Sequence, residues 1–445
     1  MKFTMSSHHT CKEEGLGMTA KWGKAAACFL VSAAIVSGCG KGGDGGSGAQ
    51  KETAEAKPAK PVTLTLYNAQ PGALDFEKAG IVEAVKQKYP HITLNLFKRE
   101  KGMEYADWVT GQTPVDIIYE STAFTVSSIK QFGLHVDLQE QIKLHGFKPE
   151  TFEPNVLAHA YSTNSERKLY GLPFTMNRYA LYYNKNLFDR FGAAYPKDGL
   201  TWDETYELAK KMTRADAGAA YNGFTALPNN ILLNNQLSLN PLNAKEDKAA
   251  MNTDEWKLLF NNLRRFGEIP NNKFVPVTDS VKGTVAMILD SGSISQAGAE
   301  LDWDLVSVPE LPQKPKTGFK PASLSLFLSA TSEHKEEAFK VMAFLVSAEF
   351  QTKLTKQAVG TPLADPEVRK AFGQDLPQWK GKNVKALYYY PDAPAIPPRA
   401  EHLTNVAVNF SKLFTSEADS NTILRDFDEE INKAIQTEKM KTQTK

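Results

Sequence analysis

The sequence lacks cysteine over nearly all of its length, and it lacks an excess of charge of either sign. Its 3 cysteines, Cys11, Cys28 and Cys39, all lie near the N-terminus of the 445-residue chain, so the remainder can form no internal disulfide. We therefore expect stability to come from burial in a large fold. The formal net charge is +1. Without a basic stripe or an acidic block, nucleic acid is not an expected partner.

The sequence also lacks the short motifs of common enzyme classes. It contains no G-x-S-x-G elbow, no H-E-x-x-H, no Walker A loop, no G-x-G-x-x-G after a strand and no C-x-x-C. Its histidines are scattered without the spacing of a metal site. We therefore expect no catalysis, no cofactor and no metal. A secreted glycoside hydrolase remains an alternative, because its pair of carboxylates leaves no motif in a sequence.

What the N-terminal region does contain is the pattern of an export signal. Lys21 and Lys24 precede the apolar stretch AAACFLVSAAIVSG, residues 25–38, which is shorter than the roughly 20 residues of a membrane-spanning helix. The letters VSGC, ending at Cys39, resemble the lipobox of bacterial lipoproteins. That resemblance implies cleavage before Cys39 and a diacylglycerol on its thiol. The alternative is a buried apolar helix with an incidental cysteine, but a helix-breaking glycine tract follows at once.

The segments on either side of this signal are polar. Residues 1–17 are too polar for the start of a signal, so Met18 is an alternative initiator within the signal region 1–39. Residues 40–61 hold no apolar side chain larger than alanine, which predicts a disordered tether with a mean reach of about 25 Å. A lipid at Cys39 and this tether predict a body held at the extracellular face of the cell membrane by the anchor alone.

Hydrophobic periodicity predicts where strands and helices follow in the folded part. Alternating or fully apolar runs predict strands at 62–68, 92–98, 115–120, 304–308 and 324–328. Helical spacing predicts helices at 76–89, 104–110, 121–132, 252–266, 335–354 and 421–435. Thr201 and Glu204 form a capping box that opens one more helix, through Met212. Strands that alternate with helices indicate an α/β layered lobe with a largely parallel sheet.

In such sheets, ligands bind beyond the carboxyl ends of the strands. That rule selects Tyr67, Asn68 and Gln70, which end or follow the first predicted strand. It also selects Glu120 and Ser121 at the end of the third. All of these side chains carry groups that donate or accept hydrogen bonds.

Several stretches resemble, in their order and spacing, the type-1 extracellular solute-binding proteins that serve ABC sugar importers. They are PVDIIYES (114–121), KLYGLPFTMNRYALYYNKNLFDRFG (168–192), GLTWDETYELAKKM (199–212), GTVAMILDSGSIS (283–295), SEHKEEAFKVMAFLVSAEFQTKL (332–354) and GTPLA (360–364). The resemblance covers nearly everything from Val62 onward. It implies an α/β, periplasmic-binding-protein-like type II fold of two lobes joined by a hinge. Lobe 1 is expected at 62–174 and 322–372, and lobe 2 at 175–321 and 373–440.

The same resemblance implies a function. A monomeric receptor would bind a small solute, in this family a sugar or oligosaccharide, in the cleft between its lobes and deliver it to the ABC permease subunits. A ligand-sensing lipoprotein that feeds a signalling kinase is the alternative.

The resemblance also implies ligand residues. Asn177 matches a sugar-binding carboxylate position of maltose-type binders, and Arg178 lies beside it. The amide can bond sugar hydroxyls, and the guanidinium can grip a carboxylate or phosphate. A surface or inter-lobe contact is the alternative for either. Glu120, Asn229 and Ser293 match positions where those binders carry aromatic residues, and His402 or Leu403 lies near a further such position. Asn230 adds another amide.

Aromatic faces normally stack on the CH patches of sugars. Their replacement by polar groups predicts a ligand that is smaller or more polar than a maltodextrin. We expect Asn177→Ala or Glu120→Ala to abolish binding and to leave the stability of the unliganded protein unchanged.

Overall fold

The computed structural model describes residues 60–243, 245–396, 403, 406–414 and 416–443. They belong to one compact unit, Ala59–Lys445. The predicted signal, most of the predicted tether, Cys39 and His402 lie outside the described residues. Within that part of the chain, no helix combines the length and the apolar character needed to cross a bilayer.

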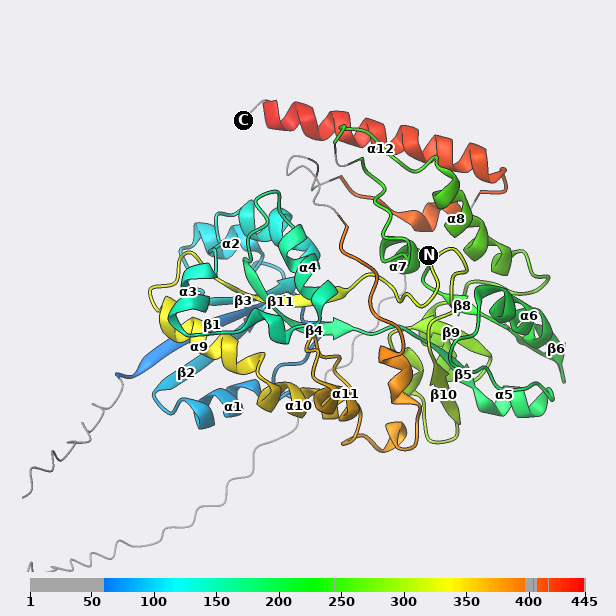
Figure 1. Ribbon diagram of the computed structural model, residues 1–445, viewed down its shortest axis with the longest axis horizontal. Coiled ribbons are helices and arrows are strands. Elements are labelled where there is room, and N and C mark those ends of the chain that lie inside the picture. Colours follow the sequence, from blue (N-terminus) through cyan, green and yellow to red (C-terminus); the bar gives the residue numbers. More distant parts are fainter. Residues whose placement is uncertain (1–59, 244, 397–402, 404–405, 415, 444–445) are drawn as a thin grey trace, which may run out of the picture. The chain divides into compact units, whose positions relative to one another are not determined.

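The first sheet has the strand order β2-β1-β3-β11-β4 (Figure 1). Its strands are β1 (Val62–Asn68), β2 (Ile92–Lys98), β3 (Ile117–Ser121), β4 (Gly171–Asn177) and β11 (Ala322–Leu328). β1 pairs in parallel with β2 and β3, whereas β11 runs antiparallel between β3 and β4. Leu324 of β11 pairs with Ser121 and with Thr175, so the start of β11 lies beside the ends of both neighbours.

The first sheet is buried on both faces. Leu64 and Leu66 of β1 contribute to one hydrophobic core, whereas Tyr67, whose side chain points to the other face, contributes to another. This alternation is the period of two that a strand imposes on its side chains. The helices of this part are α1 (Ile81–Lys88), α2 (Tyr105–Thr110), α3 (Gln139–Leu144), α4 (Pro154–Ser162), α9 (Lys335–Leu345), α10 (Ala348–Lys356) and α11 (Pro366–Lys370).

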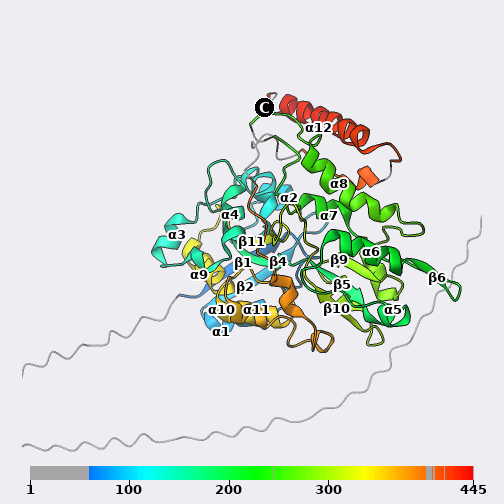
Figure 2. The same ribbon diagram turned by 45° about the vertical axis from the view of Figure 1, so that its right-hand side comes forward.

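The second sheet has the order β10-β5-β9-β8 and its own helices (Figure 2). Its strands are β5 (Ala180–Asn184), β8 (Thr225–Ala226), β9 (Met287–Asp290) and β10 (Trp303–Val306), with β6 (Arg214–Asp216) and β7 (Ala219–Tyr221) as a separate hairpin. The helices are α5 (Lys185–Arg190), α6 (Trp202–Met212), α7 (Pro228–Leu233), α8 (Asp254–Gly267) and α12 (Ser420–Gln443). Only β8 and β9 run parallel among these pairs of the described chain.

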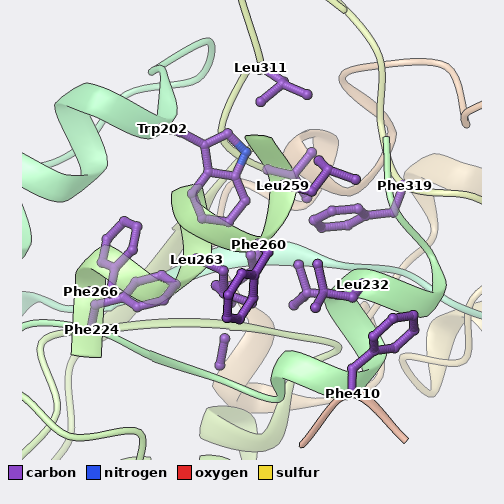
Figure 3. Packing of buried hydrophobic residues seen from close by; sticks show 14 of the residues in the cluster. Trp202, Phe224, Leu232, Leu259, Phe260, Leu263, Phe266, Leu311, Phe319 and Phe410 are labelled. Atoms are coloured by element: carbon purple, nitrogen blue, oxygen red, sulfur yellow. The ribbon is translucent and has the colours of Figure 1, made fainter. Parts of the chain in front are cut away.

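An aromatic core lies beneath the helices of the second sheet (Figure 3). Trp202 at the start of α6 packs edge-on against Phe266 of α8, with ring centroids 5.9 Å apart. Its indole N–H donates to Gln236 at 3.0 Å, so the buried polar atom is satisfied. Trp256 of α8 stacks on Phe410, which ties the C-terminal segment to the same core.

The observed bounds agree more closely with the predicted strands than with the predicted helices. The capping box of Thr201 and Glu204 is present. The first helix begins at Ile81 because Gly80, at φ 63°, interrupts the turns before it. The predicted helix 335–354 is two helices, since the Ser347 side chain caps a new one by accepting from Phe350. The predicted helix 121–132 is wrong: a 3₁₀ turn, Thr122–Phe124, leads into a π-helix, Thr125–Lys130.

Candidate functional site

A cavity of about 350 Å³ lies between parts of the chain that belong to the two sheets. From the first sheet it receives Thr175, Met176, Asn177 and Leu324, and from the loops after β1 and β4 it receives Ala73 and Arg178. From the segment after β9 it receives Ser291, Gly292, Ser293, Ser295 and Gln296. The segment after α10 adds Gln357, Ala358, Val359, Gly360, Phe372, Leu376 and Trp379. The structure therefore brings three of the predicted ligand residues, Asn177, Arg178 and Ser293, to one cavity.

Asn177 and Arg178 are adjacent, but their side chains have different surroundings. Asn177 ends β4 opposite Ala322 and is exposed. Arg178 is only 7% exposed, and its Nη1 donates to both carboxylate oxygens of Asp392, at 2.7 and 2.9 Å. The Tyr388 ring lies 4.8 Å from its guanidinium. The charge of Arg178 is thus already neutralised, so the guanidinium is not free to grip an anionic ligand.

The loop after β9 forms the opposite wall. Asp290 accepts a hydrogen bond from the backbone N–H of Ser293 at 2.8 Å, and the Ser295 hydroxyl donates to the Gly292 carbonyl at 2.7 Å. Gly292 has φ 115°, and a Cβ there would lie 3.3 Å from the Tyr182 hydroxyl. Only glycine suits both the dihedral angle and the close approach. The turn therefore places three serines, Ser291, Ser293 and Ser295, in the cavity wall, next to an aromatic floor.

That floor consists of buried rings. Trp379 packs against Phe372, Trp303 and Tyr182, with ring centroids 4.9, 5.0 and 6.4 Å apart. Trp379 is 5% exposed and Phe372 is 6% exposed, so both expose little of their faces to the cavity. Within the described residues, neither the Trp379 indole N–H nor the Tyr182 hydroxyl has a hydrogen-bond partner.

A second group of predicted residues meets at the ends of β1 and β3. Glu120 is 1% exposed and accepts hydrogen bonds from Gln70 Nε2, from the Tyr105 hydroxyl at 3.0 Å and from the Ser121 N–H at 2.7 Å. Burial, and then the charge of Glu120, raise the pKa of Tyr105, so its phenol stays a donor. Glu120 is therefore a buried anchor for Gln70 and is not itself presented to a solute.

Tyr67 and Asn68, two more of the predicted ligand residues, make contacts within the protein. Tyr67 is fully buried in an apolar core, and its hydroxyl donates to the Met103 carbonyl at 2.8 Å. Asn68 is 7% exposed, and its amide hydrogen-bonds the turn that follows β1. Its Nδ2 donates to the Leu74 carbonyl, and its Oδ1 accepts from the Gln70 backbone N–H. Each polar atom of the two side chains thus already makes a hydrogen bond within the protein.

Asn229 and Asn230 lie in α7 and do not line the cavity. The Asn229 amide oxygen accepts from the Phe410 N–H at 2.9 Å, which fastens α7 to the C-terminal segment. The Asn230 carbonyl accepts from the Asn234 amide at 3.0 Å. Among the residues that the structure describes, no group of His, Cys, Asp and Glu is placed to hold a metal ion.

Sequence reasoning missed the segment 357–360 and Phe372 as parts of the cavity wall. The only signal was the stretch GTPLA, which matched the family pattern without indicating a role. An isolated bridge between Met176 and Gly360 brings this segment to the end of β4. A Cβ on Gly360 would lie 2.4 Å from the Met176 carbonyl, so glycine permits the contact.

Comparisons with known proteins agree with this architecture. The family model of the bacterial extracellular solute-binding proteins matches residues 75–352. A binding protein of Brucella abortus (strain 2308) is 23% identical over an alignment of 401 residues that covers 82% of this chain and 90% of that protein.

Two solved structures illustrate the likeness of fold. An ABC substrate-binding protein from Listeria monocytogenes, in complex with cycloalternan, aligns with a TM-score of 0.65 at 19% identity, over 85% of this chain and 99% of that one. The sugar-binding protein MalE from Xanthomonas citri aligns with a TM-score of 0.66 at 13% identity, over 86% and 100%. The predicted α/β, periplasmic-binding-protein-like fold is confirmed.

Proposed function

Because the chain belongs to the bacterial extracellular solute-binding proteins, we propose that it is the receptor of an ABC importer for a small saccharide. The observation that carries this proposal is the cavity of about 350 Å³, which takes its walls from both sheets. Its volume lies at the lower end of the usual range for small-molecule sites. A solute that contacts both walls stabilises their approach by that differential affinity.

The chemistry of the walls supports a neutral, hydroxyl-rich solute. The residues that line the cavity include three that carry hydroxyls, Ser291, Ser293 and Ser295, and three that carry amides, Asn177, Gln296 and Gln357. Such groups both donate to and accept from sugar hydroxyls. The charge of Arg178 is held by Asp392. The cavity therefore offers a carboxylate or phosphate ligand no unpaired arginine, so a neutral sugar fits it better.

The proposal does not extend to catalysis. A glycosidase needs two carboxyl groups that flank the scissile bond. The described residues that line the cavity include no Asp or Glu.

The predicted site residues are retained selectively. We keep Asn177 and Ser293 as contacts within the cavity, with Gln70, Ser121 and Asn230 as proposed contacts beyond it. His402 stays a proposed contact outside the described residues. Arg178 and Glu120 become groups that position their neighbours, and Tyr67, Asn68 and Asn229 are left out.

The wider proposal concerns the lobes and the anchor. We propose lobes at 62–174 with 322–372 and at 175–321 with 373–440, a monomeric body, and a permease that reads its liganded form. We also propose a lipid on Cys39, for which the sequence pattern VSGC is the support. Mass spectrometry of Cys39 peptides from membranes tests the anchor.

A thermal-shift series tests the saccharide proposal. Maltose, mannotriose, cycloalternan and D-tagatose are the probes, with citrate as the anionic control. At a hundredfold excess over the dissociation constant, binding stabilises the native state by about 2.7 kcal/mol. That stabilisation raises the unfolding midpoint by a few degrees. A shift with citrate and none with any sugar would contradict the proposal.

A further inference from the structure

A second cavity, of about 610 Å³, borders the cavity that takes its walls from both sheets. Its lining comes from residues between 295 and 303 and between 377 and 382, and we call it the outer groove. Part of its wall is the run Ala297, Gly298 and Ala299, which carries no side-chain atom beyond Cβ. None of the predicted ligand residues lines the outer groove, so it is a space to which no role has been assigned.

Ser295 and Gln296 connect the two spaces, because both residues line the cavity and the outer groove. They end the 3₁₀ turn Ser293–Gln296 that follows β9. The backbone of this turn is hydrogen-bonded, since the Ser295 N–H donates to the Gly292 carbonyl at 3.0 Å. A wall of fixed geometry therefore passes from one space into the other.

The opposite wall also runs from one space into the other. Trp379 lines the cavity, and its neighbour Gln378 lines the outer groove. Both belong to the 3₁₀ turn Pro377–Trp379. The Trp379 ring packs edge-on against Trp303, a residue of the outer groove, with ring centroids 5.0 Å apart. A solute that extends out of the cavity therefore meets continuous walls on two sides.

Two charged side chains of the outer groove, Asp302 and Lys382, are paired with each other. The Asp302 carboxylate accepts from Lys382 Nζ at 3.3 Å and from Lys185 Nζ at 2.6 Å. The Lys382 ammonium also lies 4.8 Å from the centroid of the Trp303 ring. The Lys382 side chain is only 16% exposed, so these contacts hold it in place. A neutral solute can hydrogen-bond such paired groups without bringing a counter-charge.

We infer that the outer groove binds further sugar units of the same solute, so that the receptor takes an oligosaccharide longer than a disaccharide. This inference rests on the proposed function. The cavity alone lies near the lower end of the usual range of about 300–1,000 Å³ for small-molecule sites, whereas the two spaces together come near its upper end. The outer groove has residues whose hydroxyl, amide and ammonium groups can bond sugar hydroxyls, namely Ser295, Gln296, Gln378 and Lys382.

Isothermal titration with sugars of increasing length tests the inference. The probes are maltose, maltotriose and maltotetraose, with mannobiose, mannotriose and mannotetraose as a second series. In the series that the parent protein binds, the dissociation constant should fall about tenfold from two to four units, which is the net gain from one or two hydrogen bonds. An affinity that stays level with length would overturn the inference and leave the receptor proposal standing.

Substitutions in the outer groove should affect the longer sugars alone. Ala299→Trp fills the groove from an exposed position and should reduce the affinity for the four-unit sugar to that for the two-unit sugar. Gln378→Ala removes one amide and should raise the dissociation constant of the four-unit sugar about threefold. The matched control is Ala194→Trp, at an exposed position in the loop after α5 that lines neither space, and it should bind like the parent.

The outcomes separate this inference from the proposed function. If Ala299→Trp and Gln378→Ala both keep the parent's gain with length, the extra units bind elsewhere and the inference is wrong. If both variants weaken the two-unit and four-unit sugars by the same factor, the outer groove does not hold further units, and the inference is again wrong. A parent that binds only the monosaccharide D-tagatose would refute the oligosaccharide and keep the receptor. If the parent binds no sugar at all, both proposals fall.

Discussion

Arg178 and Asp392, 214 positions apart in the sequence, form a buried ion pair with 2.7 Å between Nη1 and Oδ1. Their side chains are 6% and 12% exposed. The Asp392 carbonyl also accepts from the Asn155 amide of α4 at 2.7 Å. Burial lowers the pKa of the guanidinium, but the charge of Asp392 and the hydrogen bond to it outweigh burial, so Arg178 stays charged. The pair thus fastens the segment around Asp392 to the end of β4 and to α4.

We expect Arg178→Ala or Asp392→Ala to lower the free energy of unfolding by about 3–5 kcal/mol. Either change leaves the other charge buried without its partner. Urea unfolding followed by circular dichroism measures the loss. The matched control is Glu367→Ala, which breaks an ion pair with Lys370 whose side chains are 78% and 69% exposed. The control should cost less than about 0.5 kcal/mol. Equal losses in the buried and exposed pairs would refute the anchoring role of Arg178.

Asn177→Ala should abolish sugar binding and leave the unliganded protein as stable as the parent. Asn177 is exposed at the end of β4 and lines the cavity. None of the described hydrogen bonds involves the Asn177 amide, so the substitution leaves no protein group without its partner. Titration calorimetry and a melting curve, run side by side, check both halves of this expectation. A variant that still shows the parent's affinity would remove Asn177 from the site.

Glu120→Ala should behave differently from Asn177→Ala, contrary to the expectation from sequence. It would leave Gln70 Nε2, the Tyr105 hydroxyl and the Ser121 N–H without their acceptor. Each lost partner of a buried donor costs about 1–3 kcal/mol. We therefore expect a lower unfolding midpoint even without ligand, measured by the same melting curves. Glu120→Gln keeps one acceptor oxygen and should recover part of the loss.

The strands could be predicted closely because their apolar pattern is local. Val62–Asn68 and Ile92–Lys98 have the predicted bounds. Their side chains alternate between two faces within a few residues, so no distant contact is needed to recognise them. The capping box at Thr201 is equally local, since its two partners lie three residues apart. The α/β fold follows from these elements and from the family resemblance.

The site could be predicted only in part, because its chemistry depends on contacts between distant residues. No local pattern connects Arg178 with Asp392. From the sequence alone, the arginine was therefore expected to be available to bind an anionic ligand. Glu120 stood at the correct end of its strand, but its burial depends on Tyr105 and Gln70. The 3₁₀ turn and the π-helix that replace the predicted helix 121–132 have no signature in the sequence.

Gly292→Ala should weaken both folding and binding. At φ 115° a side chain is strained, at a cost of about 1–3 kcal/mol. The added Cβ would also lie 3.3 Å from the Tyr182 hydroxyl, in a wall of the cavity. Gly72→Ala is the control, because a Cβ there meets nothing within 4 Å. Urea unfolding should show a loss for Gly292→Ala alone, and comparable values for the two variants would disprove the strain.

His159 on α4 makes the stability sensitive to mild acid. The side chain is 8% exposed, and burial, followed by the charge of Lys320, lowers its pKa to about 3. In the unfolded chain a histidine titrates near 6.5. Between these two pKa values, His159 therefore binds a proton in the unfolded state but not in the native state. The stability that neutral His159 contributes is complete above about pH 6.5 and is lost as the pH falls toward about 3.

Replacing His159 with phenylalanine removes this proton uptake and keeps the ring's volume. We expect the parent to lose on the order of 2 kcal/mol more than His159→Phe between about pH 6.5 and pH 4.5, since each pH unit below the unfolded pKa costs at most about 1.4 kcal/mol. Urea unfolding at pH steps of about half a unit measures the two slopes. His334→Gln, at an exposed position, serves as the control and should keep the parent's slope. If His159→Phe shows the same slope as the parent, the acid sensitivity resides in other groups, and the buried imidazole does not stay neutral by burial.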